Sequence, residues 1–528
     1  MQASFLRYDS YLICICDGAC SSRHGSFSKH LDFPSENLDA VLSVGEKMAL
    51  TFDRDQKDTI AAIATGTSEA GIGIIRVSGP DAERILHCLY RTRSGMSKKE
   101  WKPNTIHYGV IIDPLQDEEV IDEVLVSWMK APHSYTTEDT AEINTHGGRF
   151  ILNRVLDAVL CCGARLAEPG EFTKRAFLGG RMDLSEAGAV MDLIHAQNEF
   201  ARKVSLHQLQ GSVSGKIKEL RGRVLYEIAF IESALDDPEN YSLEGYLSRL
   251  SNICTDIHRE LCGFLRRSEQ GSVLKEGIRT VIIGKPNAGK SSLMNAMAGE
   301  ERAIVTSIAG TTRDTLCETI RLGDILLHVT DTAGIRETED EVEKIGVERA
   351  KKALEDSQLI LFVLDSSADI SKEDLEIASI VQKEIDAGKC GIVIKNKSDL
   401  PSSIGEEETK SLLQGERVRV METSLLHSNS ADYDSVLERL RLTIEELFQF
   451  DTVLNSNEPF VSAAFQKNSI REAIHSLELV QESIEMGMSE DFFSIDLRNA
   501  YSSLGKVIGE EVEDDLVEEI FSRFCLGK

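Results

Sequence analysis

Eight residues combine glycines, lysines and a serine in the spacing that binds the phosphates of a nucleotide. Residues 284–291 have the sequence GKPNAGKS and follow the apolar run 279–283, which fits the pattern GxxxxGK followed by Ser or Thr between a strand and a helix. The glycines let backbone amides turn toward phosphates, and the start of the next helix favours an anion. We expect Lys290 to neutralise the β- and γ-phosphates and Ser291 to ligate Mg²⁺.

Two further segments follow in the sequence order expected for a switch that senses the γ-phosphate. Thr311 and Thr312 can close on the metal ion when that phosphate is present. Residues 331–334 have the sequence DTAG and follow the apolar run 325–330. Here Asp331 is expected near Mg²⁺, with the Gly334 amide facing the γ-phosphate.

A third segment predicts the base of the nucleotide. Residues 396–399 have the sequence NKSD and follow the apolar run 391–395. A carboxylate at Asp399 can accept hydrogen bonds from N1–H and the N2 amine of guanine, whereas adenine has neither donor. The motif therefore predicts GTP rather than ATP.

The position after DTAG departs from Ras-type enzymes, which place there a glutamine that orients the attacking water. In this chain the position is Ile335, which cannot orient water. A nearby carboxylate, a partner or a metal ion must do so instead. The acidic run 337–343 supplies candidates, although such runs are most often solvated loops.

These motifs need a parallel sheet to position them, and the chain predicts one. Residues 277–450 alternate strand-like and helix-like segments, as a parallel sheet requires. Residues 183–270 contain a single proline and carry helical periodicity, which returns over residues 465–524. The nucleotide module is therefore predicted as an α/β insertion in a helical domain.

Another α/β domain is predicted ahead of the helical one. Strands are expected at 59–64, 73–77, 105–112, 120–129 and 141–145, and helices at 81–90, capped by Asp81, and 149–162. The fold class is thus multidomain, α/β plus all-α. The expected parts are residues 1–47 (an extension without fixed structure), 48–179 (α/β), 180–276 (helical), 277–450 (nucleotide module) and 451–528 (helical).

Residues 1–47 fit neither a secretory signal nor a transit peptide, because they hold six acidic and four basic residues and no long apolar run. They are interpreted as a flexible extension or as sequence upstream of a start at Met48. The residues Cys14, Cys16 and Cys20 could bind a metal ion, but no second ligand cluster matches them.

Composition limits the function classes. The chain has 528 residues, with 58 Lys+Arg against 88 Asp+Glu and a net charge of −30, so any RNA contact requires a local basic patch. No apolar stretch is long enough for a membrane-spanning helix. Eleven scattered cysteines are typical of reduced residues in a cytosolic protein.

Four segments of the chain resemble one family. They are residues 73–79 (GIIRVSG), 169–177 (PGEFTKRAF), 306–314 (TSIAGTTRD) and 524–528 (FCLGK). Their order resembles that of the bacterial and organellar tRNA modification GTPases of the MnmE (TrmE) family, and the likeness extends over residues 58–528.

The resemblance implies a tetrahydrofolate-binding α/β dimerisation domain, a discontinuous helical domain and an inserted Ras-like P-loop G domain. The family acts with the flavoprotein MnmG, which supplies FAD and NADH chemistry. Together they add a carboxymethylaminomethyl or aminomethyl group to C5 of the wobble uridine of certain tRNAs. The one-carbon unit comes from (6S)-5-formyl- or 5,10-methylene-tetrahydrofolate.

The partners that the resemblance implies are a second copy of the chain, an MnmG-type flavoprotein in a heterotetramer or larger complex, and tRNA. Neither DNA nor a membrane is expected, and the expected location is the cytoplasm. GTP hydrolysis would drive dimerisation of the G domains and a conformational change.

The resemblance also assigns nucleotide contacts and two metal ions. The implied GTP contacts are Asn287, Ala288, Gly289, Lys290, Ser291, Ser292, Thr306, Thr312, Asp331, Thr332, Ala333, Gly334, Asn396, Lys397 and Asp399. The implied Mg²⁺ ligands are Ser291 and Thr312, and the implied K⁺ ligands are Asn287, Thr306, Ile308 and Thr311.

An amide oxygen, backbone carbonyls and a hydroxyl would give K⁺ the hard oxygen ligands that it prefers. The ion would neutralise charge between the β- and γ-phosphates, as an arginine finger does elsewhere. The family's water-orienting carboxylate maps to Glu343, which would orient the attacking water in place of the glutamine that Ile335 replaces. The alternative for Glu343 is a solvated residue at the start of a helix.

The implied folate-binding residues are Arg76, Glu142, Arg181 and Lys528. A carboxylate suits the guanidine-like face of a pterin, and arginine suits the carboxylates of the glutamate tail. Cys525 could act as a nucleophile in catalysis or merely pack. The last guanine loop departs from the usual Ser-Ala, because Thr423, Ser424 and Leu425 stand there and leave its base contact open.

Two clusters of basic residues are candidate tRNA contacts. Residues 451–528 hold sixteen acidic and six basic residues, so this end repels phosphate. The basic clusters lie in the first α/β domain and just after it, at Arg91, Arg93, Lys98, Lys99 and Lys102, and at Lys174, Arg175 and Arg181.

Two other functions stay open: a regulatory GTPase that does not modify RNA, and a folate enzyme that acts on a small molecule with GTP as a gate. The pair Arg76 and Glu142 and the CLGK tail have no purpose in the former.

Overall fold

The computed structural model divides the chain into two units, residues 1–57 and 58–528. It describes residues 5–8, 11–14, 58–66, 68–98, 100–236, 245–299, 317–331, 352–425, 430–450, 458–512 and 514–527. In the first unit, β1 (Phe5–Tyr8) pairs antiparallel with β2 (Tyr11–Cys14). Tyr, Leu and Ile favour strands. The rest of the expected extension lies outside the described residues.

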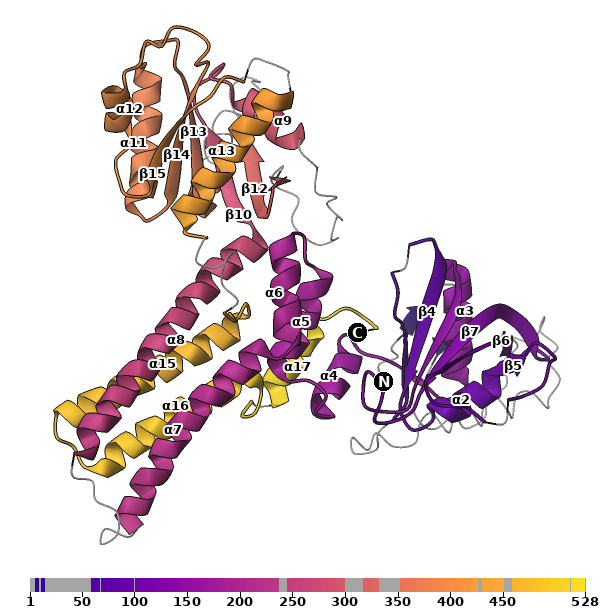
Figure 1. Ribbon diagram of the computed structural model, residues 1–528. Helices are drawn as coiled ribbons and strands as arrows, with labels where there is room; N and C mark the ends of the chain where they lie inside the picture. The colour runs from indigo at the N-terminus through magenta and orange to yellow at the C-terminus, as the bar shows by residue number, and fades with distance from the viewer. Residues whose placement is uncertain are drawn as a thin grey trace, which may run out of the picture. The chain divides into compact units, whose positions relative to one another are not determined.

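A seven-stranded sheet opens the second unit (Figure 1), with the order β5-β6-β7-β8-β4-β3-β9. The strands are β3 (Ile60–Ile63), β4 (Ala70–Ser78), β5 (Tyr90–Thr92), β6 (Thr105–Asp113), β7 (Glu119–Met129), β8 (Thr140–Gly147) and β9 (Arg165–Leu166). All neighbours pair antiparallel except β3 and β9. The predicted strands of this domain are therefore present, at slightly different bounds.

Two helices, α2 (Ala82–Leu89) and α3 (Arg149–Cys161), pack on this sheet. Ile85 of α2 and Val155 of α3 are fully buried in one apolar cluster with Ile75 and Val77 of β4. Side chains alternate along a strand, so Arg76, between Ile75 and Val77, belongs to the opposite face. This alternation separates the core of the domain from the face that carries its candidate site.

The predicted cap of α2 is wrong in one respect. Asp81 stands at the N-cap position, but its side chain makes no capping hydrogen bond. Its carboxylate instead accepts a hydrogen bond from Arg84 Nε at 2.9 Å, so the charge pair within the first turn replaces the cap.

Helices make up most of the rest of the second unit outside the nucleotide module. They are α4 (Glu171–Leu178), α5 (Leu184–Ile194), α6 (Glu199–Leu209), α7 (Ser212–Asp236), α8 (Tyr246–Glu276), α15 (Ala464–Glu485), α16 (Glu490–Ile508) and α17 (Asp514–Ser522). The long helices α7, α8, α15 and α16 pack side by side, α16 against α7 and α15, and α15 against α8 (Figure 1). Segments far apart in the sequence thus build one helical domain, as predicted.

The nucleotide module inserts a six-stranded sheet between α8 and α15, with the order β11-β12-β10-β13-β14-β15. Its strands are β10 (Ile278–Ile283), β11 (Cys317–Leu322), β12 (Ile325–Asp331), β13 (Leu359–Asp365), β14 (Cys390–Asn396) and β15 (Val418–Glu422). Its helices are α9 (Lys290–Gly299), α11 (Lys372–Asp386), α12 (Glu406–Leu412) and α13 (Ser430–Phe448). The predicted fold class, α/β combined with all-α, is confirmed.

One edge of this sheet differs from the fully parallel prediction. β11 pairs antiparallel with β12, whereas β12, β10, β13, β14 and β15 are parallel. Gly323, with a φ of 60°, lies in the short link between β11 and β12. A glycine adopts this left-handed conformation without steric cost, which allows the chain to reverse in a hairpin.

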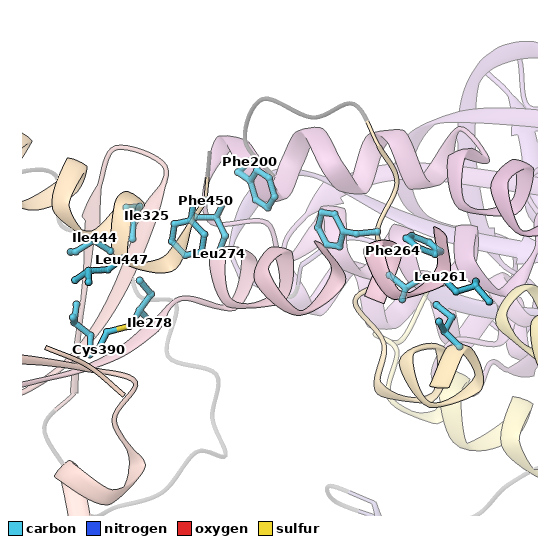
Figure 2. Close-up of a cluster of buried hydrophobic side chains, with 14 of the residues drawn as sticks. Phe200, Leu261, Phe264, Leu274, Ile278, Ile325, Cys390, Ile444, Leu447 and Phe450 are labelled. Atoms are coloured by element: carbon cyan, nitrogen blue, oxygen red, sulfur yellow. The ribbon is translucent and has the colours of Figure 1, made fainter. Parts of the chain in front are cut away.

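A buried cluster links residues of the helices and of the nucleotide module, and Figure 2 shows part of it. Phe200 of α6 and Leu274 of α8 belong to the same cluster as Ile325 of β12 and Phe450 after α13. Within the described ranges, no helix has the length and apolar character needed to cross a membrane.

Candidate functional sites

The parallel strands bring the predicted nucleotide motifs to one edge of the six-stranded sheet. β10 ends at Ile283, directly before the phosphate loop, and β12 ends at Asp331. β13 and β14 end at the paired residues Asp365 and Asn396. Ligands of open parallel sheets bind outside the carboxyl ends of the strands, so this edge is the candidate nucleotide site.

The phosphate loop adopts backbone conformations that suit the residues of its sequence. Asn287 and Gly289 have φ angles of 62° and 109°, and a Cβ at Gly289 would collide with the side-chain amide of Asn396. Lys290 Nζ donates hydrogen bonds to the carbonyl oxygens of Gly284 at 2.6 Å and Lys285 at 2.9 Å. The loop therefore wraps around the ammonium group that is predicted to meet the phosphates.

Two side chains fix the loop from outside. Asn396 is 3% exposed, and its Nδ2 donates to the carbonyl of Ala288 at 2.9 Å, which joins the base motif to the phosphate loop. Lys285 Nζ donates to Asp374 Oδ2 at 2.9 Å. Burial opposes ionisation of Asp374, but hydrogen bonds from Lys285 and Ser371 outweigh it and lower the pKa of the Asp374 carboxyl.

The base motif is held by its neighbours along the same edge. Lys397, with a φ of 64°, forms an ion pair with Asp365. Ser424 Oγ donates to Asp399 Oδ1 at 2.6 Å, and the Ser398 amide donates to the carbonyl of Thr423 at 3.0 Å. Thr423 and Ser424, which stand where the family usually has Ser-Ala, therefore contact the base motif. Whether they also contact guanine stays a prediction.

Part of the predicted site lies outside the described residues. Ser291 and Ser292 lie in α9, and Asp331 ends β12, although its side chain is not described. The predicted residues outside the described ranges are Thr306, Ile308, Thr311, Thr312, Thr332, Ala333, Gly334, Glu343 and Lys528.

The first α/β domain brings together three of the four residues predicted to bind folate. Arg76 of β4 and Glu142 of β8 are paired in register. Arg76 Nε and NH2 lie 3.0 Å and 2.9 Å from Glu142 Oε1, and the two side chains are 12% and 25% exposed. The pair is thus partly shielded from water, which strengthens its electrostatic interaction.

Tyr135, in the segment between β7 and β8, connects Arg76 to Arg181. The Arg76 Cζ lies 5.1 Å from the centre of the Tyr135 ring, and the Arg181 Cζ lies 4.9 Å from it. Arg181 NH1 also donates to the carbonyl of Tyr135 at 2.8 Å. Phe172 of α4 is fully buried, and its ring centre lies 5.6 Å from Arg76 Cζ.

The tail of the chain completes this site. Arg76 NH1 donates to the carbonyl of Gly527 at 3.3 Å, and the Gly170 amide donates to the carbonyl of Cys525 at 3.3 Å. Gly527 has a φ of 86°, and a Cβ there would collide with the backbone of Ile63. The side chain of Cys525 is exposed, so its predicted alternatives, catalysis or packing, both stay open.

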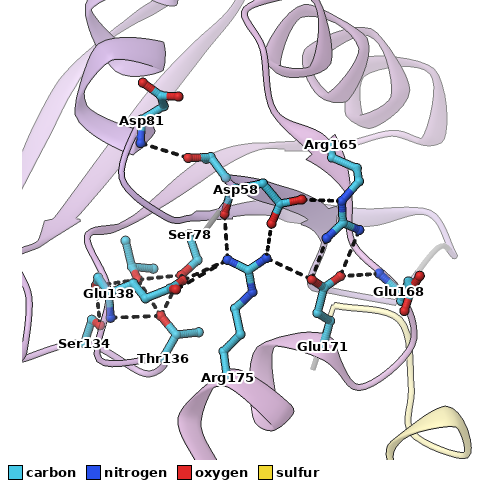
Figure 3. Close-up of polar contacts among 12 residues, drawn as sticks. Asp58, Ser78, Asp81, Ser134, Thr136, Glu138, Arg165, Glu168, Glu171 and Arg175 are labelled. Carbon is cyan, nitrogen blue, oxygen red and sulfur yellow. Dashed lines mark hydrogen bonds and ion pairs between the residues drawn. The ribbon is translucent and has the colours of Figure 1, made fainter. Parts of the chain in front are cut away.

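An ion-pair network lies where α4 meets the start of β3 and the β7–β8 segment (Figure 3). The Arg175 guanidinium contacts the carboxylates of Asp58, Glu138 and Glu171 at 2.6, 3.1 and 2.9 Å. Arg165 adds a second cation, 2.7 Å from both Asp58 and Glu171. Three carboxylates and two guanidinium groups therefore compensate one another.

The network lowers the pKa of two of its acids. Burial opposes ionisation of Asp58 and Glu171, but hydrogen bonds from Arg165 and Arg175 outweigh it. The pKa of each carboxyl therefore lies below its ordinary value, and both acids are ionised at neutral pH.

The basic clusters predicted to contact tRNA are largely engaged within the chain. Arg175 belongs to the network, and Lys174 lies 3.4 Å from Glu518. Arg91 pairs with Glu118 at 2.5 Å, and Lys98 Nζ lies 2.7 Å from His107 Nδ1. Burial and the charge of Lys102 lower the pKa of Lys98. Arg93 is exposed, and Lys99 lies outside the described residues.

Sequence reasoning missed several residues that position these sites. Asp365 follows the wholly apolar run 359–364, and an acid at the end of a buried strand is a signal that could have been used. Tyr135 and Asp374 carry no such signal, because their partners are far away in the sequence. The role of Ser424 was left open by its departure from the usual Ser-Ala.

Comparison with known families decides the relationship of the chain. Residues 59–181 match the family described as GTP-binding protein TrmE N-terminus. Residues 184–525 match the family described as MnmE helical domain. The chain belongs to the MnmE family of tRNA modification GTPases. The resemblance inferred from the sequence is therefore confirmed.

Curated relatives support this membership over nearly their whole length. The chain is 49% identical over 472 residues to tRNA modification GTPase MnmE of Lachnoclostridium phytofermentans, covering 89% of this chain and 99% of that protein. It is 44% identical over 472 residues to MnmE of Thermoanaerobacter pseudethanolicus, with the same coverage. It is 42% identical over 472 residues to MnmE of Bacillus subtilis, covering 89% of this chain and 100% of that protein.

Among solved structures, the chain is similar to a variant of Era from Aquifex aeolicus bound to GDP and aluminium fluoride. The identity is 24%, the match covers 38% of this chain and 66% of that chain, and the TM-score is 0.23. A score this low adds no support beyond the family matches.

Proposed function

We propose that this member of the MnmE family is a potassium-dependent GTPase that modifies the wobble uridine of certain tRNAs. With an MnmG-type flavoprotein that supplies FAD and NADH chemistry, it adds a carboxymethylaminomethyl or aminomethyl group to C5 of that uridine. The one-carbon unit comes from (6S)-5-formyl- or 5,10-methylene-tetrahydrofolate. The observation that carries the proposal is that one chain holds a phosphate loop at a parallel sheet edge and a separate arginine–glutamate site in a TrmE-type N-terminal domain.

The nucleotide part of the proposal rests on the edge where the strands end. The loop around Lys290 and the helix α9 provide a positive environment for phosphates. Asp399 provides the carboxylate that selects guanine, and Ser424 holds one of its oxygens at 2.6 Å. Mg²⁺, when bound by Ser291 and Thr312, supplies charge stabilisation at the β- and γ-phosphates.

The potassium part rests on the left-handed backbone at Asn287, which lies in the phosphate loop. Its side-chain oxygen, together with oxygens of Thr306, Ile308 and Thr311, would form a ligand set that suits a monovalent cation. Bound K⁺ supplies positive charge next to the phosphates. Glu343 would orient the attacking water, since Ile335 cannot.

The folate part rests on the shielded pair of Arg76 and Glu142. A reduced pterin presents adjacent N–H donors, which a carboxylate can accept in a bidentate way. Arg181 offers a guanidinium group for the tail carboxylates, and Lys528 would add a second cation. We further propose that two copies of the chain associate, and that tRNA and the flavoprotein bind the assembled dimer.

Reconstitution tests the whole proposal. The full chain, the flavoprotein with FAD and NADH, GTP, Mg²⁺, K⁺, a tetrahydrofolate one-carbon donor and an unmodified tRNA are combined with ammonium or glycine, which supplies the amine of the added group. The wobble uridine is then analysed by mass spectrometry. A mass increase that requires both GTP and the folate is expected. GTP consumption with the uridine left unmodified would contradict the proposal and favour a regulatory GTPase.

Hydrolysis rates test the potassium and water-orienting roles separately. GTP hydrolysis should be at least about tenfold faster in K⁺ than in Na⁺ at equal ionic strength, because the smaller ion fits the same oxygens poorly. The substitution Glu343→Ala should retain GTP binding and lose most hydrolysis. Equal rates in the two salts would remove the potassium role, and retained turnover in the variant would move the water-orienting role to another group.

A further inference from the structure

Tyr135 occupies a position between two arginines that come from separate segments of the chain. Arg76 lies in β4, and Arg181 follows α4. Their guanidinium carbons lie 5.1 Å and 4.9 Å from the centre of the Tyr135 ring, within the range of a cation–π interaction. Among the described residues, Tyr135 is the aromatic ring that lies against both arginines, whereas Phe172 lies against Arg76 alone.

Tyr135 is itself held at three points. Its hydroxyl lies 3.0 Å from Thr173 Oγ1 of α4, its carbonyl accepts from Arg181 NH1 at 2.8 Å, and its half-buried ring packs against the apolar cluster that contains Phe172. The ring is therefore fixed by contacts that do not require a ligand.

The segment that carries Tyr135 is also fixed, as Figure 3 shows for its neighbours. Thr136 is fully buried, with its Oγ1 2.6 Å from Ser78 Oγ. Glu138 Oε2 accepts from Arg175 NH1 at 3.1 Å and from Ser78 Oγ at 2.9 Å. Ser134 Oγ donates to the Glu138 carbonyl at 2.5 Å. The residues before and after Tyr135 in the sequence are thus held in place by hydrogen bonds and an ion pair, which fixes the position of the aromatic ring.

We infer that Tyr135 is a positioning residue for ligand binding, which holds Arg76 and Arg181 at a fixed spacing for a ligand with a polar ring at one end and a carboxylate at the other. This inference rests on the proposed folate function. A free arginine side chain loses rotamer freedom when it binds, and a ring that orders two arginines beforehand removes that cost. Affinity for the two ends of the ligand should therefore depend on one aromatic side chain.

The test compares two ligands and three forms of the full chain by isothermal titration. The probes are (6S)-5-formyl-tetrahydrofolate and 5-formyl-6-methyl-tetrahydropterin, which lacks the whole aminobenzoyl-glutamate tail and therefore every carboxylate. The forms are wild type, Tyr135→Leu, which removes the π face, and Tyr135→Phe, which keeps it and removes only the hydroxyl. GTP hydrolysis and the melting temperature of the same preparations check that each form is folded.

The leucine substitution should raise the Kd for 5-formyl-tetrahydrofolate about tenfold, the combined effect of two cation–π contacts of ordinary strength. The phenylalanine substitution should stay within about twofold of wild type, since the ring remains. For the probe without a tail, the leucine substitution should cost only about threefold, because Arg181 then has no carboxylate to bind. A purely structural defect would weaken both probes equally.

The outcomes separate this inference from the proposed function. A wild-type chain that binds neither probe overturns the folate function, and the inference with it. A wild-type chain that binds 5-formyl-tetrahydrofolate while the leucine form binds it equally well overturns the inference alone. An equal loss for both probes also overturns it. If the leucine form does not fold, Tyr135→Gln carries the same comparison, since glutamine is polar and also lacks a π face.

Discussion

The nucleotide edge and the Arg76–Glu142 site are built in opposite ways. At the nucleotide edge, short contiguous motifs follow successive strands, and backbone groups and glycines make most of the shape. At the other site, the residues are dispersed, and Arg76 and Gly527 are 451 positions apart. Charged and aromatic side chains make that site, and the fold alone brings them together. The difference predicts that each site can be disabled without affecting the other.

Removal of the phosphate-loop cation should have the largest effect. Lys290→Ala should lower kcat/KM for GTP by at least about 100-fold, because the charge that stabilises the transferring phosphate is lost. The Kd for 5-formyl-tetrahydrofolate should stay within about twofold of wild type. Hydrolysis assays and titration of one preparation measure both, and Lys372→Ala, at an exposed lysine on α11, is the control. A joint loss of both activities would mean that the sites are not separate.

The base-reading carboxylate should come next. Asp399→Asn should weaken GTP binding about 100-fold, because an amide presents a donor to guanine where the carboxylate accepted two hydrogen bonds. The same variant should gain affinity for xanthosine triphosphate, which offers an oxygen at that position. Competition titration with both nucleotides measures the change, and Asp369→Asn, at an exposed aspartate of the same module, is the matched control. Unchanged selectivity in the asparagine variant would place base recognition elsewhere.

The shielded ion pair of the other site should give a smaller effect. Arg76→Gln should raise the Kd for 5-formyl-tetrahydrofolate about 30-fold, since Glu142 loses a charged partner and the site loses a charge-assisted donor. GTP hydrolysis should be unchanged. Arg93→Gln, at an exposed arginine of the same domain, controls for net charge. Wild-type folate affinity in the Arg76 variant would remove this pair from the ligand site.

The network around Arg175 should give the smallest effect, visible in acid. A carboxyl whose pKa is lower in the folded chain stabilises the fold above its unfolded pKa, and this contribution is lost as pH falls through the folded value. Asp58 and Glu171 have lowered pKa values, from ordinary values of 3.8 and 4.5. The melting temperature should therefore fall as pH drops below about 4.5. In Arg175→Met this acid-dependent loss should be smaller, and an identical pH profile would show that the network does not contribute.

Local signals account for what could be predicted from the sequence. The structure places the phosphate loop directly after β10, with Asp331 of DTAG at the end of β12 and Asn396 of NKSD at the end of β14. The strands of the first domain were predictable from apolar runs broken by glycine, and alternation along β4 separates Ile75 and Val77 from Arg76. These patterns are local because neighbouring residues share one strand or one loop.

Contacts between distant segments could not be predicted in the same way. Nothing near Asp374 in the sequence indicates that it will bind Lys285, and nothing near Tyr135 indicates two arginines. The antiparallel strand β11 was missed because the sequence of a single strand does not show whether it pairs parallel or antiparallel with its neighbour. Arg175 was predicted as part of a basic patch, whereas three carboxylates from separate segments surround it.

The hydrogen bond from Arg76 to Gly527 has a consequence for synthesis of the chain. These two residues are 451 positions apart, and at about 5–20 residues per second the ribosome needs about 20 to 90 seconds between them. During this interval the first domain can fold, with Glu142 already available to neutralise Arg76. Residues 525–527 emerge after that domain, so Arg76 can donate to the Gly527 carbonyl only once the intervening helices and the nucleotide module have been synthesised.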